Sequence, residues 1–408
     1  AFRARTIQVM SKTPVVVTGM GIVSALGVDL GAFSAGLRAG RSGVRKQEHL
    51  ASAGVRSDLC ADAAEPEFPE GLALPKYTSR PDRFGLRAAL SAVADAGLTA
   101  AQLQGAAVVF GTGTGGAQDT EDYLRGRLGG QSPPVELLIS HQPASVTDLV
   151  ARVLGAQGPR ATVMTACSSS AIALSQARDQ IALGRVQVAV AGGAEGLCML
   201  TLAGFGALRA TSPEACRPFD VDRKGLNLGE GAAVLILESE AHARARGARI
   251  YARFVGAGLS CDAHHMTAPH PEGAGALRAM QAALTDAQLG PEAVGYINAH
   301  GTGTPHNDAA ESAAVRALLG ARAAQVPISS IKSMVGHTLG AAGAIEAVAS
   351  VVSLHQGFLP PTVNLQTPDP AFGLDLIMGE ARAQRVQVVM SSSFAFGGNN
   401  AVLLFTQP

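Results

Sequence analysis

The chain has 408 residues, of which 47% are hydrophobic and 16% are charged, which is typical of a densely packed globular protein and excludes a disordered one. Lysine plus arginine equals aspartate plus glutamate at 32 each, so the overall charge gives no basis for nucleic-acid binding. No apolar run reaches the roughly 18 residues of a membrane-spanning helix, so we expect no membrane association.

The first residues, AFRARTIQVM, lack the apolar centre of a secretory signal. Met10 resembles a native start, and we expect residues 1–9 to be a remnant in front of it. The five cysteines have no CxxC spacing, which argues against a disulfide framework and a zinc site and favours a reducing cytoplasm. They are Cys60, Cys167, Cys198, Cys216 and Cys261. We therefore expect a cytoplasmic protein without a bound metal.

Short β-branched runs alternate with longer alanine-rich runs along the chain. The expected strands of a first series are 14–18, 107–110, 161–165, 186–190 and 232–237. Those of a second series are 250–255, 295–298, 326–329, 386–390 and 401–405. The main expected helices are 83–96, 168–183, 275–287, 309–319 and 341–354. This alternation predicts an α/β protein with layered helices and buried, mostly parallel strands.

The two series look like copies of one unit. VVFGTGTGG at 108–116 resembles YINAHGTGT at 296–304, each being a strand that leads into a glycine–threonine turn. Five expected strands in each series suggest an internally duplicated fold. Segments 56–76 and 130–147 are rich in turn-forming and polar residues and are expected on the surface.

One cysteine lies where an expected strand passes into an expected helix. In TVMTACSSSAIAL, Cys167 would begin the helix, where unsatisfied N–H groups and the helix dipole favour a thiolate. Small neighbours leave room for a substrate to approach the sulfur. A buried, inert cysteine is the alternative interpretation.

Three further segments place polar groups at strand ends. NAHGTGTPHND carries His300, and SSIKSMVGHTLGAAG carries Lys332 and His337, with Glu346 following on a helix. SSSFAFGGNNA at 391–401 ends a strand with a glycine pair. Each has an ordinary structural explanation alone, but four such turns over both halves indicate one catalytic site.

These motifs, together with RPFDVDRKGLNLGEGA at 217–232, resemble the β-ketoacyl-acyl-carrier-protein synthases, in particular the elongating class that uses Cys-His-His and the related polyketide ketosynthases. The resemblance runs from about Pro14 to Phe405. It implies a thiolase-like fold of two duplicated halves in αβαβα layers. Residues 10–250 would form the half with the nucleophile and 251–408 the half with both histidines.

The implied reaction is a decarboxylative Claisen condensation in fatty acid or polyketide elongation. An acyl chain would be held on Cys167 and attacked by a carbanion from malonyl-acyl-carrier protein. By resemblance, the oxyanion would be met by the N–H groups of Cys167 and Phe396, and the enolate by His300 and His337. Lys332 would organise the site by pairing with Glu346 or Asp308.

The resemblance also implies roles around the substrate. Thr302 and Thr304 would bind the phosphopantetheine arm, which the carrier protein brings, so no intrinsic cofactor is expected. Phe394, Phe396, Phe205 and Thr114 would form the acyl gate and pocket, and an unpaired Thr114 hydroxyl there would favour polyketide-type or unsaturated chains. Arg209 and Arg80 would dock the acidic carrier protein. A homodimer, or a heterodimer with a chain-length-factor-like paralogue, is expected.

Other classes fit the residues less well. A thiolase needs a second catalytic cysteine near the C-terminus, but the last cysteine is Cys261. Starter condensing enzymes use Cys-His-Asn, whereas GHTLGAAG supplies a second histidine. A cysteine protease would leave Lys332, the second histidine and the duplication unexplained. A non-catalytic chain-length partner would lack the nucleophile, and this alternative is separated by thiol titration followed by a condensation assay.

Overall fold

All ten predicted strands form and join one sheet. The computed structural model describes residues 12–51 and 54–408, so the prediction for residues 1–9 lies outside the described residues. In chain order, the main strands are β1 (Val15–Val23), β4 (Ala107–Gly111), β5 (Arg160–Val163), β6 (Val188–Glu195), β8 (Gly231–Ser239), β9 (Ala252–Cys261), β10 (Tyr296–Asn298), β11 (Pro327–Ser329), β13 (Asp375–Leu376), β15 (Val388–Phe394) and β16 (Asn399–Thr406). Short strands form two small sheets: β2 (Arg45–Lys46), β3 (Leu59–Ala61) and β7 (Leu228–Gly229), and β12 (Phe358–Leu359) with β14 (Arg382–Ala383).

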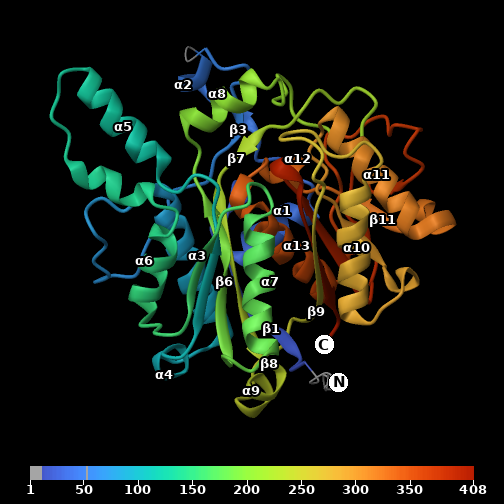
Figure 1. Cartoon of the computed structure of the whole chain (residues 1–408), viewed down its shortest axis with the longest axis horizontal. Helices are drawn as coiled ribbons and strands as arrows, with labels where there is room; N and C mark the ends of the chain where they lie inside the picture. Colours follow the sequence, from blue (N-terminus) through green and yellow to red (C-terminus); the bar gives the residue numbers. More distant parts are fainter. Residues whose placement is uncertain (1–11, 52–53) are drawn as a thin grey trace, which may run out of the picture.

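The sheet is built from two copies of one strand arrangement. Its order is β13-β11-β10-β15-β16-β9-β1-β8-β6-β4-β5, and Figure 1 labels β1, β6, β8, β9 and β11 of this sheet. Numbered within each series, both halves follow the order 3-2-4-5-1, and the two first strands, β1 and β9, pair across the middle. The resembling segments 108–116 and 296–304 fall on β4 and β10, the second strand of each series. The duplication inferred from the sequence is therefore confirmed.

The expectation of mostly parallel strands is wrong. β4 runs parallel to β5 and β6, and β10 parallel to β11 and β15, but β1, β8, β9 and β16 pair antiparallel with their neighbours. Strands covered by helices on both faces are apolar throughout whichever way they run, so the apolar pattern could not reveal their direction.

Helices cover both faces of each half and fill the space between them. The longer ones are α1 (Leu30–Arg38), α3 (Arg80–Ala96), α5 (Ala117–Leu128), α6 (Ser145–Leu154), α7 (Ser169–Ala182), α8 (Met199–Ala207), α10 (Ala274–Ala287), α11 (Pro305–Leu319) and α13 (Ala342–Gln356). The short ones are α2 (Glu48–Ala51), α4 (Ala100–Leu103), α9 (Glu240–Ala245), α12 (Lys332–Val335), and the 3-10 turns η1 (Val135–His141), η2 (Pro291–Ala293), η3 (Gly320–Ala324), η4 (Leu339–Ala341) and η5 (Phe396–Gly398). In the described residues, no helix is long and apolar enough to cross a bilayer.

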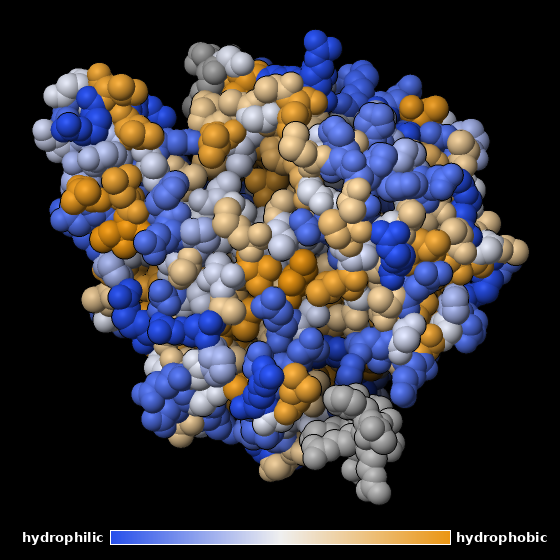
Figure 2. Space-filling model, viewed as in Figure 1, coloured by the Kyte–Doolittle hydropathy of each residue, from blue (hydrophilic) through white to orange (hydrophobic). Residues whose placement is uncertain are grey.

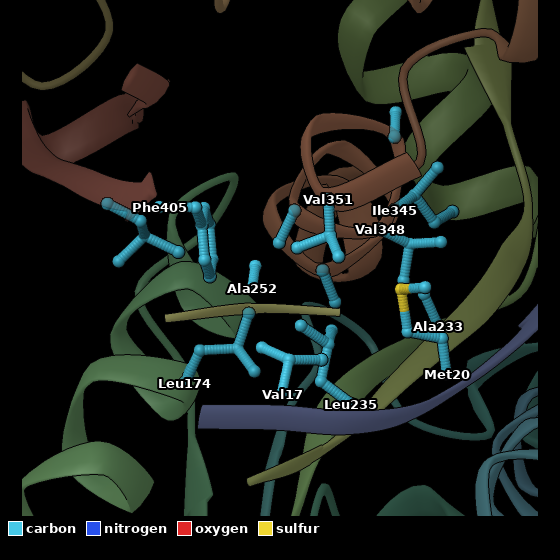
Figure 3. Close-up of a cluster of buried hydrophobic side chains, with 14 of the residues drawn as sticks. Val17, Met20, Leu174, Ala233, Leu235, Ala252, Ile345, Val348, Val351 and Phe405 are labelled. Atoms are coloured by element: carbon cyan, nitrogen blue, oxygen red, sulfur yellow. The ribbon is translucent and has the colours of Figure 1, made fainter. Parts of the chain in front are cut away.

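The two central helices, α7 and α13, contact both halves of the sheet. Residues 342–354 of α13 are all buried, so this helix has no solvent-facing side. Figure 3 shows Ile345, Val348 and Val351 of α13 facing β1 and β8, with Leu174 of α7 and Phe405 of β16 in the same cluster. With α3 and α6 outside one half and α10 and α11 outside the other, the layers are αβαβα.

Candidate active site

Cys167 lies in a tight turn between β5 and α7. The serines after it serve this turn: Ser169 donates from its hydroxyl to the Ala166 carbonyl (2.6 Å) and accepts from the Thr165 N–H (2.9 Å). Ala166 has a positive φ of 52°, which a small side chain tolerates best. The helix begins at Ser169 with Ser168 as its N-cap, so Cys167 lies just before the first turn rather than within it. The small residues thus let the turn present a thiol.

Gly111 at the end of β4 brings the start of α7 close to the sheet. A Cβ atom on this glycine would lie 2.2 Å from the Ser170 backbone nitrogen, so no larger residue fits. This close approach fixes where the start of the helix, and with it the thiol, lies relative to β4.

His337 points its Nε2 atom at the sulfur, 3.1 Å from Cys167 Sγ. Its Nδ1 atom accepts the Leu339 N–H (3.3 Å). The backbone N–H of His337 donates to the Asn227 carbonyl (2.7 Å). Because Nδ1 is an acceptor, the proton of the neutral ring is on Nε2. His337 therefore presents an N–H donor to the thiol and to whatever is attached to it.

Lys332 holds the second histidine. Its ammonium group donates to the His300 carbonyl (2.7 Å), to His300 Nδ1 (3.1 Å) and to the Glu346 carboxylate, and all three side chains are buried. These bonds use its three N–H groups and leave the His300 ring proton on Nε2. The partner of Lys332 is thus Glu346, and the alternative partner, Asp308, makes other contacts.

Two buried carboxylates on α11 shape the turn that carries His300. Glu311 accepts the N–H groups of His300 and Gly301, both at 2.8 Å. Asp308 accepts from Gly303 N (3.2 Å) and Phe219 N (2.8 Å), which ties the RPFD segment to this turn. Asp308 therefore supports the site through the backbone and not through the lysine.

The burial of the site sets its proton affinities. Burial raises the pKa of Cys167 to about 12, although the Lys332 charge and the Phe396 N–H act to lower it. The expectation that the helix start lowers this pKa is wrong, because desolvation of the buried thiolate outweighs the helix dipole. Burial and then the Lys332 charge hold the pKa of His300 and of His337 well below 6.5. Both rings are therefore neutral N–H donors at physiological pH.

The sulfur and one nitrogen of each histidine converge within 4.8 Å of one another. Such a donor set has the composition of a zinc site. However, a metal needs an unprotonated ring nitrogen, and the Leu339 and Lys332 contacts place the protons on the Nε2 atoms that face the sulfur. The arrangement fits hydrogen-bond donation to a group on the sulfur better than it fits metal binding.

A cavity of about 450 Å³ leads from the surface to these groups. Thr302 and Thr304 line it, with their hydroxyls 2.9 Å apart, and the exposed Arg209 lies on its wall. The rings of Phe205 and Phe396 stack in it with centroids 5.4 Å apart, and Phe394 packs against His300. Cys167, His300 and His337, the two threonines and the three phenylalanines all line this one cavity, whereas Lys332 lies behind it.

Arg80 is not at this cavity, and its guanidinium group is already paired within the protein. Its guanidinium group makes three hydrogen bonds to Glu230 and one to Glu65, and donates to the Ala63 carbonyl. Through these hydrogen bonds, Arg80 holds the loop after β3 against the start of α3. The sequence around Arg80 gives no sign of this role, because its partner Glu230 lies 150 residues further along the chain.

Thr114 is also placed differently from the expectation. Its hydroxyl and its N–H both bond to the buried Glu195 carboxylate, and it does not line the cavity that contains Cys167. The hydroxyl is therefore paired, and the inferred preference for polyketide-type or unsaturated chains loses its basis.

Two buried carboxylates near the site, Glu195 and Glu311, were not predicted from the sequence. The (i, i+3) spacing of Asp308 and Glu311 could have indicated Glu311.

Comparison with known proteins agrees with this geometry. The family models for the β-ketoacyl synthase N-terminal and C-terminal domains match residues 12–243 and 251–366. The 3-oxoacyl-[acyl-carrier-protein] synthase 2 of Synechocystis is 40% identical, with 97% of this chain and 98% of that protein covered.

Two solved structures are similar in fold and sequence. The ishigamide ketosynthase/chain length factor has a TM-score of 0.92 at 37% identity, covering 97% of this chain and all of that one. AntDE:AntF, a type II polyketide synthase carrier protein with its ketosynthase, has a TM-score of 0.90 at 33% identity and the same coverage. The fold and the Cys-His-His site define a thiolase-like condensing enzyme. The chain belongs to the β-ketoacyl synthase family.

Proposed function

We propose that this protein is an acyltransferase that condenses an acyl group on Cys167 with malonyl-acyl-carrier protein. The observation that carries the proposal is the convergence of one buried thiol and two imidazole N–H donors at the end of a single cavity. A thiol holds an acyl group as a thioester, and paired donors stabilise an enolate.

In the first half-reaction, the Cys167 sulfur attacks the thioester carbonyl of an acyl-carrier protein. The carbon–sulfur bond to the pantetheine breaks, and the thiol proton of Cys167 leaves with the departing pantetheine sulfur. The N–H groups of Cys167 and Phe396 both act to lower the pKa of the Cys167 thiol, so they lie near enough to the sulfur to bind the oxyanion that forms beside it.

In the second half-reaction, malonyl-carrier protein loses carbon dioxide. The electrons of the broken carbon–carbon bond form an enolate on the thioester oxygen, and the Nε2–H groups of His300 and His337 donate to it. The enolate carbon then attacks the acyl carbonyl and expels the Cys167 thiolate, giving β-ketoacyl-carrier protein; the thiolate takes up a proton from water, which restores the thiol. Burial strengthens both donations, because little water screens the charge.

The pantetheine arm enters through the cavity past Thr302 and Thr304. Arg209 is exposed on the wall of this cavity and supplies the local positive charge that an acidic carrier protein needs, while the whole chain is neutral. Neither a resident cofactor nor a metal enters the proposed reaction. The five free thiols favour work in the reducing cytoplasm.

We propose a dimer whose interface includes the free edge of the sheet. β5 is the last strand on its side, and Met164 beside it is 57% exposed. The projecting α5 and η1 expose Leu128 (90%) and Ile139 (67%), and Figure 2 shows apolar surface on the projection that Figure 1 labels α5. Unpaired edges and large exposed apolar groups are normally covered. Native mass spectrometry would distinguish a homodimer from a monomer that dimerises only with a paralogue.

Substitutions of Cys167 test the reaction. Cys167→Ala should abolish condensation and leave the fold intact. Cys167→Gln should lose condensation but keep malonyl decarboxylation, because the amide can occupy the position of an acyl thioester. Intact mass of the native protein, offered acyl-carrier proteins of several lengths, should show the acyl group on Cys167. Condensation by Cys167→Ala, or no acyl-enzyme with any chain, would refute the proposal.

A further inference from the structure

Glu195, the last residue of β6, is a buried carboxylate that the proposed reaction does not use. One oxygen accepts the N–H groups of Gly113 (2.6 Å) and Gly340 (2.9 Å), and the other accepts the N–H (3.0 Å) and hydroxyl of Thr114. Its exposure is 0%, and no cation of the described residues forms an ion pair with it. Burial raises its pKa to about 6, against the effect of these donors.

Side chains at Gly113 and Gly340 would collide with the carboxylate and with the facing backbone. A Cβ atom on Gly113 would lie 2.7 Å from Glu195 Oε2. A Cβ atom on Gly340 would lie 2.7 Å from the same oxygen and 2.3 Å from the Gly113 nitrogen. The loop after β4 and the loop that follows His337 therefore touch through glycines, and Glu195 bonds to both of them.

The contact to Gly340 controls the residue that sets the His337 tautomer. Leu339 donates its N–H to His337 Nδ1, and the next peptide N–H, of Gly340, is held by Glu195. Leu339 is thus fixed on both sides. It has a positive φ of 46°, which a bulky residue adopts only when its surroundings enforce it.

We propose that Glu195 is a positioning residue for His337: it holds the 339–340 peptide so that the Leu339 N–H stays on Nδ1 and the Nε2–H stays directed at the place beside Cys167 where the malonyl thioester of the carrier protein binds. This rests on the proposed function, because the directed N–H matters for malonyl decarboxylation. A purely structural carboxylate would affect stability alone.

The test is Glu195→Gln, measured in two partial reactions. Its side chain has the same shape, but one oxygen is replaced by an NH₂ group that faces backbone donors. Decarboxylation of malonyl-carrier protein is followed in the Cys167→Gln background, and acylation is followed by intact mass with Cys167 present. We expect decarboxylation kcat to fall about 10- to 100-fold with KM changed less than about twofold, because a misplaced donor costs that much. Acylation should change less than about threefold, since the His337 donor acts mainly on the malonyl group.

Asp95→Asn is the matched control. Asp95 also accepts a backbone N–H, from Met20 (2.9 Å), and a hydroxyl, from Tyr251 (2.8 Å), and it contacts no residue of the site. It should lower the melting temperature without changing the ratio of the two partial reactions. If Glu195→Gln does not fold, Glu195→Asp is tested in the same way, because its shorter side chain keeps the charge but does not reach the Gly340 N–H.

Equal losses in both partial reactions, or no loss in decarboxylation, would overturn the role of Glu195. A failure of the proposed function is seen separately, as absent decarboxylation in Cys167→Gln with Glu195 intact. An unchanged kcat with a raised KM would also overturn it, because that result would assign Glu195 to substrate binding.

Discussion

Lys332 gives the sharpest quantitative test of the site. Replacement by Met removes an ammonium group whose three N–H groups are all used, and it leaves a buried Glu346 carboxylate and His300 Nδ1 without their partner. Both Lys332 and Glu346 are 1% exposed, so solvent cannot replace the lost bonds.

The expected loss of stability follows from this geometry. Removing one member of a buried ion pair costs about 3–5 kcal/mol of unfolding free energy. The lower end applies here, because burial already raises the pKa of Glu346 to about 7 and the loss of Lys332 raises it further. The carboxyl group of the variant then takes up a proton instead of remaining charged.

A second substitution separates stability from function. Lys332→Met combined with Glu346→Leu replaces the pair by apolar groups, which is often neutral for stability, so about 2 kcal/mol or more should be recovered. Activity should not return, because His300 Nδ1 still lacks the donor that keeps its proton on Nε2. Decarboxylation should fall about 10²- to 10³-fold in both variants, as when one oxyanion donor is removed.

Urea unfolding followed by circular dichroism measures the first quantity, and conversion of malonyl- to acetyl-carrier protein measures the second. The reasoning is refuted if the double variant is no more stable than Lys332→Met. It is equally refuted if either variant decarboxylates at nearly the normal rate. In the first case, the cost of burying Glu346 would not depend on Lys332. In the second case, the donor function of His300 would not depend on Lys332.

Three further predictions follow from charges and pKa shifts. Because burial raises the pKa of Cys167 to about 12, its alkylation by iodoacetamide should speed up about tenfold per pH unit between about pH 7 and 9; a plateau near pH 8 would show a thiol of low pKa. Arg209→Glu should raise the KM for acyl-carrier protein roughly 3- to 10-fold, and high salt should raise it likewise. Arg80→Glu should mainly lower the melting temperature, because it breaks the Glu230 contact. A KM that does not change with salt would contradict the role of Arg209. Burial raises the pKa of Glu311 from 4.5 to about 7, so the folded state binds the extra proton between these values and stability falls as pH rises through them; melting curves of Glu311→Gln should lack this part of the decline, and curves parallel to the parent would contradict it.

The sequence predicted the secondary structure well because each element carries a local signal. α3 has an N-cap at Ser79, proline near its start and Gly97 at its end, and its apolar positions follow helical spacing. Cys167 and His300 could be named because each lies in a turn of small residues or glycines directly after a strand, where a side chain can reach a cavity. These are properties of neighbouring residues.

What could not be predicted depends on distant residues. The sign of the Cys167 pKa shift depends on complete burial, which the helix start alone does not reveal. The roles of Arg80 and Thr114 depend on Glu230 and Glu195, carboxylates that lie 150 and 81 residues further along the chain. A charged or hydroxyl side chain has the same appearance in a sequence whether it faces solvent, a substrate or a buried partner.

The duplication explains why the thiol and its donor meet. Cys167 follows β5, the third strand of the first series, and His337 follows β11, the third strand of the second series. Because both halves have the same strand order and join through their first strands, the loops after the third strands come from equivalent places in the two halves, and the 3.1 Å Sγ–Nε2 contact spans them. The first half supplies the small turn that presents the nucleophile, and the second supplies the lysine and both histidines. Neither half contains a complete site, so the chemistry requires the pairing of β1 with β9 that holds the halves together.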